Sequence, residues 1–139
     1  MAFKHGRLAE VTVATKALST FVESADINLK VAIAGTTTFT ATWDTFVSGV
    51  AGASLTLSGY YDPTVVTGPA SVLIAQIALN QAGTVTAVVF YPAGNNAGQG
   101  TSHTMNALLS DYKESPKVTG AVPWSCTLTA TGQDTVAQL

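Results

Sequence analysis

The fold of this chain is decided by residues 36–62, which read TTTFTATWDTFVSGVAGASLTLSGYYD. The second half of this stretch, residues 53–61, alternates between apolar and hydroxylated side chains. That period of two is typical of a half-buried β-strand. The first half is rich in threonine, carries three aromatic residues and has almost no charge. Because such a segment is longer than a hairpin turn needs, the sequence predicts a long hairpin arm over about residues 36–52.

The sequence allows two interpretations of this arm. In one, the hairpin folds over the core of its own domain. In the other, the arm buries its aromatic side chains against a neighbouring subunit, because long apolar hairpins invite association when they stay exposed. The second interpretation makes five arm residues candidates for a subunit interface: Thr38, Phe39, Trp43, Phe46 and Val47.

The composition indicates a single domain with little surface charge. The 139 residues can build one hydrophobic core, so we expect one domain over residues 1–139. Charged residues make up 10% of the chain, against about 25% in a typical globular protein. A surface this poor in charge favours association. The six lysine and arginine residues are scattered, which excludes the basic patch that tight nucleic-acid binding requires.

The remaining compositional features bear on where the protein is made. No apolar run approaches the roughly 20 residues of a membrane helix, so we expect no membrane insertion. The first ten residues, MAFKHGRLAE, lack the apolar core of a signal peptide. Cys126 is the single cysteine, so we expect neither an internal disulfide nor a cysteine cluster for zinc. These features together predict synthesis in a cytoplasm.

The rest of the chain reads as strands interrupted by one helix. Alternating or continuous apolar runs predict strands at residues 8–14, 26–34, 53–61, 84–91, 103–117 and 124–131. Within the run at 103–117, Leu108 breaks the alternation and indicates a bulge. So many strands with one helix predict a mainly β protein, built as a two-sheet β-sandwich or partial barrel with the helix on one flank.

The helix is predicted over about residues 69–80. Pro69 suits a first helical turn, and Gly83 suits the end of the helix. Helical spacing then gives one apolar stripe that should face the sheet: Ala70, Leu73, Ile74, Ile77 and Ala78. The far side would carry the polar residues Ser71, Gln76 and Asn80.

Motifs for catalysis or metal binding are missing from the sequence. His5 and His103 are far apart, and no HExxH, CxxC, GxSxG or phosphate-loop pattern is present. Cys126 alternates with core positions, so a buried and inert thiol is the expected reading. We therefore expect no enzyme activity, no catalytic residues, no cofactor and no metal.

One surface pattern does indicate a role. The non-core faces of three predicted strands are nearly all small, neutral and hydroxylated, where a solvated sheet face would carry lysine, glutamate and arginine. Lys30 is the exception. The plain interpretation is a threonine-rich antiparallel sheet, since threonine suits strands. The functional interpretation is a surface that must not bind what passes over it. Phosphate binding needs lysine and arginine, which this face mostly lacks.

The opening MAFKHG, the cluster TTTF at residues 36–39 and the Gly59-Tyr60-Tyr61-Asp62 end of the strand after the arm resemble the tail tube (major tail) protein family of long-tailed bacteriophages. The order of elements is also similar over nearly the whole chain. The resemblance implies two packed sheets with a flanking helix, six copies in a ring, and rings stacked into a tube that carries viral DNA to the host. On that reading the arm joins subunits, and the neutral faces line the channel: Asn28, Lys30, Ser54, Thr56, Ser58, Ser125, Thr127 and Thr129.

The same resemblance implies the partners and the location. The partners would be further copies of the chain and other tail proteins, namely the tape measure, tail terminator and distal tail proteins. DNA would pass without sequence-specific binding, and the protein would reside in the virion tail after synthesis in the host cytoplasm. Two alternatives stay open: a monomeric immunoglobulin-like β-sandwich that binds a partner, as in capsid decoration or adhesion, and a tube subunit of the secretion-system type.

Overall fold

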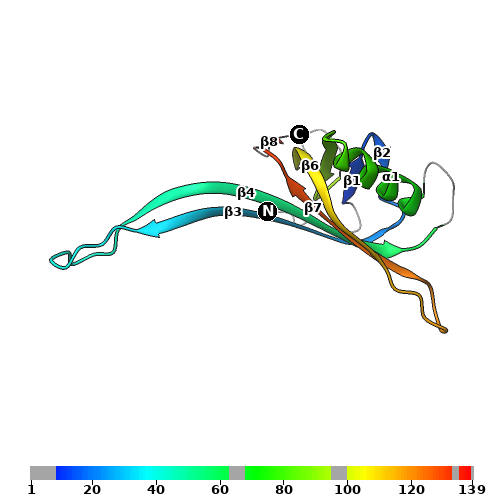
Figure 1. Ribbon diagram of the computed structural model, residues 1–139, viewed down its shortest axis with the longest axis horizontal. Coiled ribbons are helices and arrows are strands. Elements are labelled where there is room, and N and C mark those ends of the chain that lie inside the picture. The colour runs from blue at the N-terminus through cyan, green and yellow to red at the C-terminus, as the bar shows by residue number, and fades with distance from the viewer. Residues whose placement is uncertain (1–8, 63–67, 95–99, 133–134, 139) are drawn as a thin grey trace.

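The computed structural model describes residues 9–62, 68–94, 100–132 and 135–138. These ranges hold eight β-strands and one α-helix, so the predicted mainly β class with one flanking helix is confirmed (Figure 1). The elements in chain order are β1 (Glu10–Val13), β2 (Lys16–Ala17), β3 (Val22–Gly35), β4 (Phe46–Tyr60), α1 (Pro69–Gln81), β5 (Thr86–Tyr91), β6 (Thr101–Glu114), β7 (Pro123–Ala130) and β8 (Thr135–Gln138). The predicted strands correspond to β1 and β3–β7 with shifted ends. No strand is predicted from the sequence at β8, whose four residues are too few to show a period.

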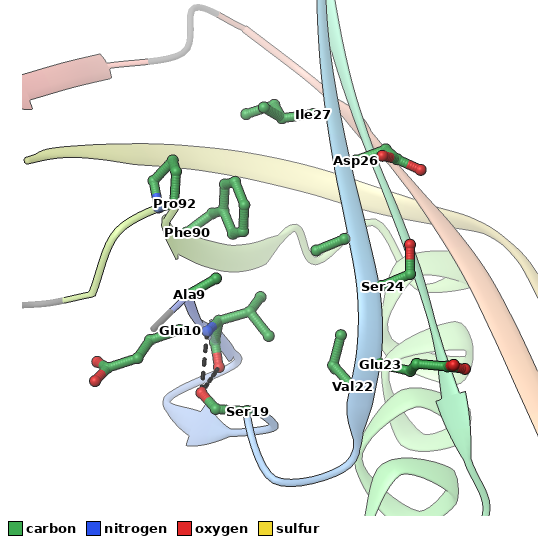
Figure 2. Close-up of a pocket in the computed structure, with 12 residues that line it drawn as sticks. Ala9, Glu10, Ser19, Val22, Glu23, Ser24, Asp26, Ile27, Phe90 and Pro92 are labelled. Atoms are coloured by element: carbon green, nitrogen blue, oxygen red, sulfur yellow. Dashed lines mark hydrogen bonds between the residues drawn. The ribbon is translucent and has the colours of Figure 1, made fainter. Parts of the chain in front are cut away.

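Of the two architectures predicted, the described strands form the partial barrel. They make one antiparallel sheet in the order β2-β1-β5-β6-β7-β4-β3, with β8 beside β6. Strands β1 and β3 lie far apart in this order, yet both line one cavity of about 700 Å³ (Figure 2). The sheet therefore curls until its two ends face each other without pairing. Twist in long strands and bulges in β3 and β6 bend the sheet in this way.

The core fills the inside of the curl. Alternate residues of β4, β5, β6 and β7 point inward, and the largest fully buried side chain is Trp124. The inward positions predicted for Leu55, Leu57, Cys126 and Leu128 are confirmed, since each is at most 1% exposed. Burial raises the pKa of the Cys126 thiol to about 12, which keeps it protonated and unreactive near neutral pH.

Helix α1 occupies the predicted residues, but the prediction of which side faces inward is partly wrong. The buried residues are Pro69, Val72 and Leu73, whereas Ile74 is 51% exposed. Asn80 also turns inward: its Oδ1 accepts a hydrogen bond from the Leu109 N–H at 2.8 Å. The helix is thus rotated toward Val72 relative to the prediction, because its amide side chains bond to the sheet.

The inward amides of α1 form a small network with the start of β5. The Asn80 Nδ2 donates to the Thr86 hydroxyl at 3.0 Å, and that hydroxyl donates to the Gln76 Oε1 at 3.0 Å. Thr86 is only 1% exposed, so its hydroxyl would be costly to bury without these partners. Gln76 and Asn80, predicted on the far side, are therefore the residues that fasten the helix to the sheet.

The hairpin arm is longer than predicted. Strands β3 and β4 pair from Val22–Gly59 out to Gly35–Phe46, whereas β7 pairs with β4 only from Ser54 onward. Residues 29–35 and 46–53 therefore form a two-stranded ribbon that extends away from the rest of the molecule (Figure 1). The predicted arm of residues 36–52 contains the tip loop, 36–45, and the outer part of β4. The arm does not fold over its own core.

Gly59 explains how the chain enters β3. A Cβ atom at this position would overlap the carbonyl oxygen of Phe21, which crosses close to β4. The pairing of Val22 with Gly59 is followed by a register shift, so the close approach coincides with a bulge. Glycine at residue 59 lets Phe21 pack beside the end of β4.

Candidate assembly surfaces

The eight residues predicted to line a channel lie on three neighbouring strands. The order β7-β4-β3 brings the three hydroxyl-rich segments side by side. The register forms rows across them, which are Asn28–Ser54–Thr129, Thr56–Thr127 and Ser58–Ser125, with Lys30 opposite Gly52. These positions alternate with the buried residues of β4 and β7, so all eight belong to the face opposite the core.

A few charged residues also lie on this polar face. Asp26 lies opposite Thr56, and Asp111 lies opposite Thr127 from the β6 side. Lys113 lies opposite Ser125, and Lys30 is the cation noted in the sequence. Glu23, in the bulge of β3, points to the same side of the strand as Asp26 (Figure 2), so the face carries charges of both signs and no excess of positive charge. The positions of Asp111 and Lys113 on this face could not be read from the alternation, because the bulge between Leu109 and Asp111 shifts it by one residue.

The arm exposes apolar side chains that its own subunit leaves uncovered. Phe39 and Trp43 in the tip loop are 110% and 83% exposed, and Phe46 is 58% exposed. Four aliphatic residues of the ribbon are also more than half exposed: Leu29, Val31, Ile33 and Val47. Thr38, the remaining predicted interface residue, is exposed in the tip loop. The structure thus brings the five predicted interface residues together at the outer end of the arm.

Threonine side chains order the arm tip despite its exposure. The Thr36 N–H donates to the Thr45 carbonyl at 2.7 Å, and the two hydroxyls lie 2.8 Å apart. The Thr45 N–H donates to the Thr37 hydroxyl at 2.9 Å, and that hydroxyl donates to Asp44 at 3.4 Å. These bonds close the tip across its base, as side-chain bonding does in other turns. The threonine cluster that the sequence analysis singled out therefore shapes the arm.

The sheet has two long free edges within the described residues. The outer edge of β3 pairs with no other strand. On β6, β5 pairs only as far as Ala107, so residues 108–114 pair with β7 alone. Unpaired backbone groups on a long edge form a template for another strand.

The end of the sheet opposite the arm tip is rich in aromatic residues. The Trp124 indole donates to the Tyr60 carbonyl at 3.0 Å, and the Tyr112 ring stacks on Trp124 with centroids 6.3 Å apart. Burial and the hydrogen bond from its hydroxyl to Glu114 raise the pKa of Tyr112 above its usual value. Beside this cluster, Phe21, Tyr60 and Tyr61 border a hollow of about 240 Å³.

The described residues contain no group of three or more His, Cys, Asp and Glu side chains that could hold a metal ion. His103 packs beside Phe90, with ring centroids 6.3 Å apart, and His5 lies outside the described residues. The described residues form one helix, α1, and it is not long and apolar enough to cross a membrane.

The fold is similar to that of proteins in three kinds of particle. The virion of a native gene transfer agent contains a chain with TM-score 0.76 and 10% identity, matched over 97% of this chain and 99% of that one. A chain in the C6-symmetric tail of the empty gene transfer agent particle matches with TM-score 0.66 and 12% identity, over 84% and 82%. The SPP1 tail tube protein matches with TM-score 0.71 and 14% identity, over 99% and 80%.

This chain has the tail tube fold. The same fold occurs in the sheath-tube complex of an extracellular contractile injection system, PVC, where TM-score is 0.73 and identity 14% over 99% of this chain and 93% of that one. No family model matches the sequence, and no significant match is found among curated proteins. The tail tube fold expected from the sequence resemblance is thus confirmed by structure, at identities of 10–16%.

Proposed function

We propose that this chain is a structural virion protein that assembles as stacked rings of six into a phage tail tube, the conduit for DNA delivery. The observation that carries the proposal is the similarity in fold to tail and tube proteins over 97–100% of the chain, a span that includes the arm. The polar face, the free strand edges and the exposed arm each supply a surface that such an assembly needs.

The free edges give a route to ring closure. Strands β6, β7, β4 and β3 lie in that order and are antiparallel throughout, so β6 and β3 run in opposite directions. If β3 of one copy pairs with residues 108–114 of β6 in the next, that seam is also antiparallel. Each copy contributes an even number of strands, so the alternation continues without a break around the ring. A ring built from such a heterologous contact buries both long edges.

The polar face would then line the channel. A duplex carries one negative charge per about 1.7 Å of axis, and a wall of lysine or arginine would bind it at many points. Here Asp26 and Asp111 offset Lys30 and Lys113, and hydroxyl groups separate them. Such a wall offers neither net attraction nor base-specific contacts, so DNA passes without sequence-specific binding.

The proposal extends to partners and location. Further copies of the chain are the main partner, and a tube also needs tape measure, tail terminator and distal tail proteins at its inside and its ends. The protein would be made in the host cytoplasm and reside in the virion tail. It would act by shape and surface chemistry, with no catalytic group, cofactor or metal.

Negative-stain electron microscopy of the purified protein tests the assembly. We expect rings with six-fold symmetry, or filaments of stacked rings. Small discrete particles at all protein concentrations would instead favour the monomeric binding module. The similarity to the injection-system tube supports a second candidate, a tube that carries a cargo other than DNA. Finding this tube in virions that contain packaged DNA would favour the phage tail tube over that candidate.

The channel assignment predicts an effect of charge at Thr129. Thr129→Lys places a cation between Ser54 and Leu108, with no carboxylate directly opposite it, and a ring repeats it in every copy. We expect tubes to form and genome release to slow by on the order of tenfold at low salt, with recovery at high salt. Timed DNA release from phage particles at two salt concentrations measures this.

Two control variants sharpen the channel test. Thr129→Gln adds length without charge and should release DNA at the normal rate. Thr56→Lys places its cation opposite Asp26, which can pair with it, so we expect a smaller delay. Normal release by Thr129→Lys particles with intact tubes would remove this face from the channel wall.

A further inference from the structure

The two ends of strand β4 lie beside two different exposed surfaces. At its first residue, Phe46, β4 joins the arm tip, where Trp43 is 83% exposed. At its last residue, Tyr60, β4 reaches the aromatic hollow. A strand of 15 residues spans about 50 Å, so the tip and the hollow of one subunit cannot meet.

The hollow has the size to receive one aromatic side chain, and its lining mixes aromatic with polar residues. Its volume is about 240 Å³, and its lining residues are Thr20, Phe21, Val22, Glu23, Tyr60, Tyr61 and Asp62. Tyr60 and Tyr61 are 50% and 41% exposed, so their rings are available for contact. Aromatic pairs gain from offset or edge-to-face contact in addition to the area they bury.

The walls of the hollow are held in place from behind. The Trp124 indole fixes the Tyr60 carbonyl, and the Tyr61 N–H donates to the Val122 carbonyl at 2.8 Å. Phe21 stays against β4 because residue 59 is glycine. A preformed site of this kind loses little conformational entropy when a side chain enters it.

The exposed area of the arm fits a specific interface with a second copy. Each buried aromatic residue contributes about 150–250 Å². Phe39, Trp43 and Phe46 with the four exposed aliphatic residues therefore offer several hundred Å², near the roughly 800 Å² per partner of a standard interface. Residues 28–53 contain only Lys30 and Asp44 as charged residues, so little charge is desolvated when the arm docks.

We propose that the arm tip of one copy seats Trp43 in the hollow beside Tyr60 and Tyr61 of a second copy, in the next ring of the stack. This inference rests on the proposed tube and names the contact that joins its rings. The tip and the hollow lie at opposite ends of one strand, so the contact repeats head to tail along the column. It leaves the strand edges free for contacts within each ring.

Cross-linking tests this contact without altering either aromatic surface. Thr42→Cys places a thiol beside Trp43, and Thr20→Cys places one at the rim of the hollow; both positions are exposed. Assembled double-cysteine protein is treated with a short bis-maleimide and separated on a denaturing gel. Buried Cys126 stays unlabelled, and Thr42→Cys with Lys16→Cys is the matched control. We expect a ladder of linked chains well beyond six for the first pair and none for the control.

Each other outcome overturns the inference in a recognisable way. A ladder that ends at six places the contact within a ring. Tubes without any ladder mean that the tip docks elsewhere, while the proposed function stands. If the unsubstituted protein forms neither rings nor filaments, the proposed function fails and the ring-to-ring contact fails with it. A second readout is the Tyr61→Ala variant, which should reduce assembly as much as Trp43→Ala, with no further loss in the double variant.

Discussion

Replacing Leu73 with aspartate is expected to unfold the protein. Leu73 is fully buried, at 0% exposure, where α1 packs on the core. Aspartate would remove the packing of a leucine, worth about 2–5 kcal/mol, and leave a carboxylate without a cationic partner in an apolar site. Together these costs match or exceed the stability of about 5–15 kcal/mol that domains possess. Circular dichroism and thermal melting should show no cooperative transition.

Ile74→Asp is the matched control for this prediction. It introduces the same charge one residue further along the same helix, at a side chain that is 51% exposed. We expect a folded subunit with a free energy of unfolding reduced by less than about 1 kcal/mol. If Leu73→Asp melts as cooperatively as Ile74→Asp, α1 does not cover the core in the way described.

The contrast between Leu73 and Ile74 shows what the sequence could and could not predict about the helix. Its bounds follow from Pro69 and from the change of period, and the sequence predicts them correctly. Its rotation does not follow, because the helix has no charged residue to mark an outer side. The rotation is set by hydrogen bonds of Gln76 and Asn80 to the sheet, including the Leu109 N–H, which depends on tertiary structure.

The strands show the same division. Alternation in β4 and β7 was enough to assign the buried and the polar faces, as Leu57 and Thr56 illustrate. It could not predict that β4 lies between β3 and β7, because pairing partners are set by the whole sheet. It indicated a bulge in β6 but could not place Asp111, which the unpaired residue between Leu109 and Asp111 moves onto the polar face.

The arm illustrates a third case. The sequence indicated an uncharged aromatic hairpin but left open whether it covers its own core. The structure decides against self-coverage, since Phe39 and Trp43 are exposed at the end of an extended ribbon (Figure 1). The surface that covers them in an assembly belongs to a second chain, so the alternation pattern of the sequence does not mark it.

Trp43→Ala is expected to abolish assembly at concentrations where the unsubstituted protein forms tubes, while the subunit stays folded. Trp43 is 83% exposed, so its removal takes little buried area from the subunit. Truncation of a buried interface tryptophan typically costs about 2–4 kcal/mol per contact. Because every 1.4 kcal/mol is about a tenfold change in an equilibrium constant, the critical concentration for assembly should rise at least about 30-fold. Phe46→Ala should act in the same direction.

Sedimentation of assembled material over a concentration series, together with a thermal melt of each variant, measures both halves of this expectation. Trp43→Phe is the control, since it keeps an aromatic ring at the same position and should assemble at concentrations close to normal. The melting temperature of Trp43→Ala should match that of the unsubstituted subunit. A large fall in melting temperature, with assembly lost in proportion, would mean that the arm stabilises its own subunit. In that case the exposed ribbon would not be an interface, and its aromatic residues would need another explanation.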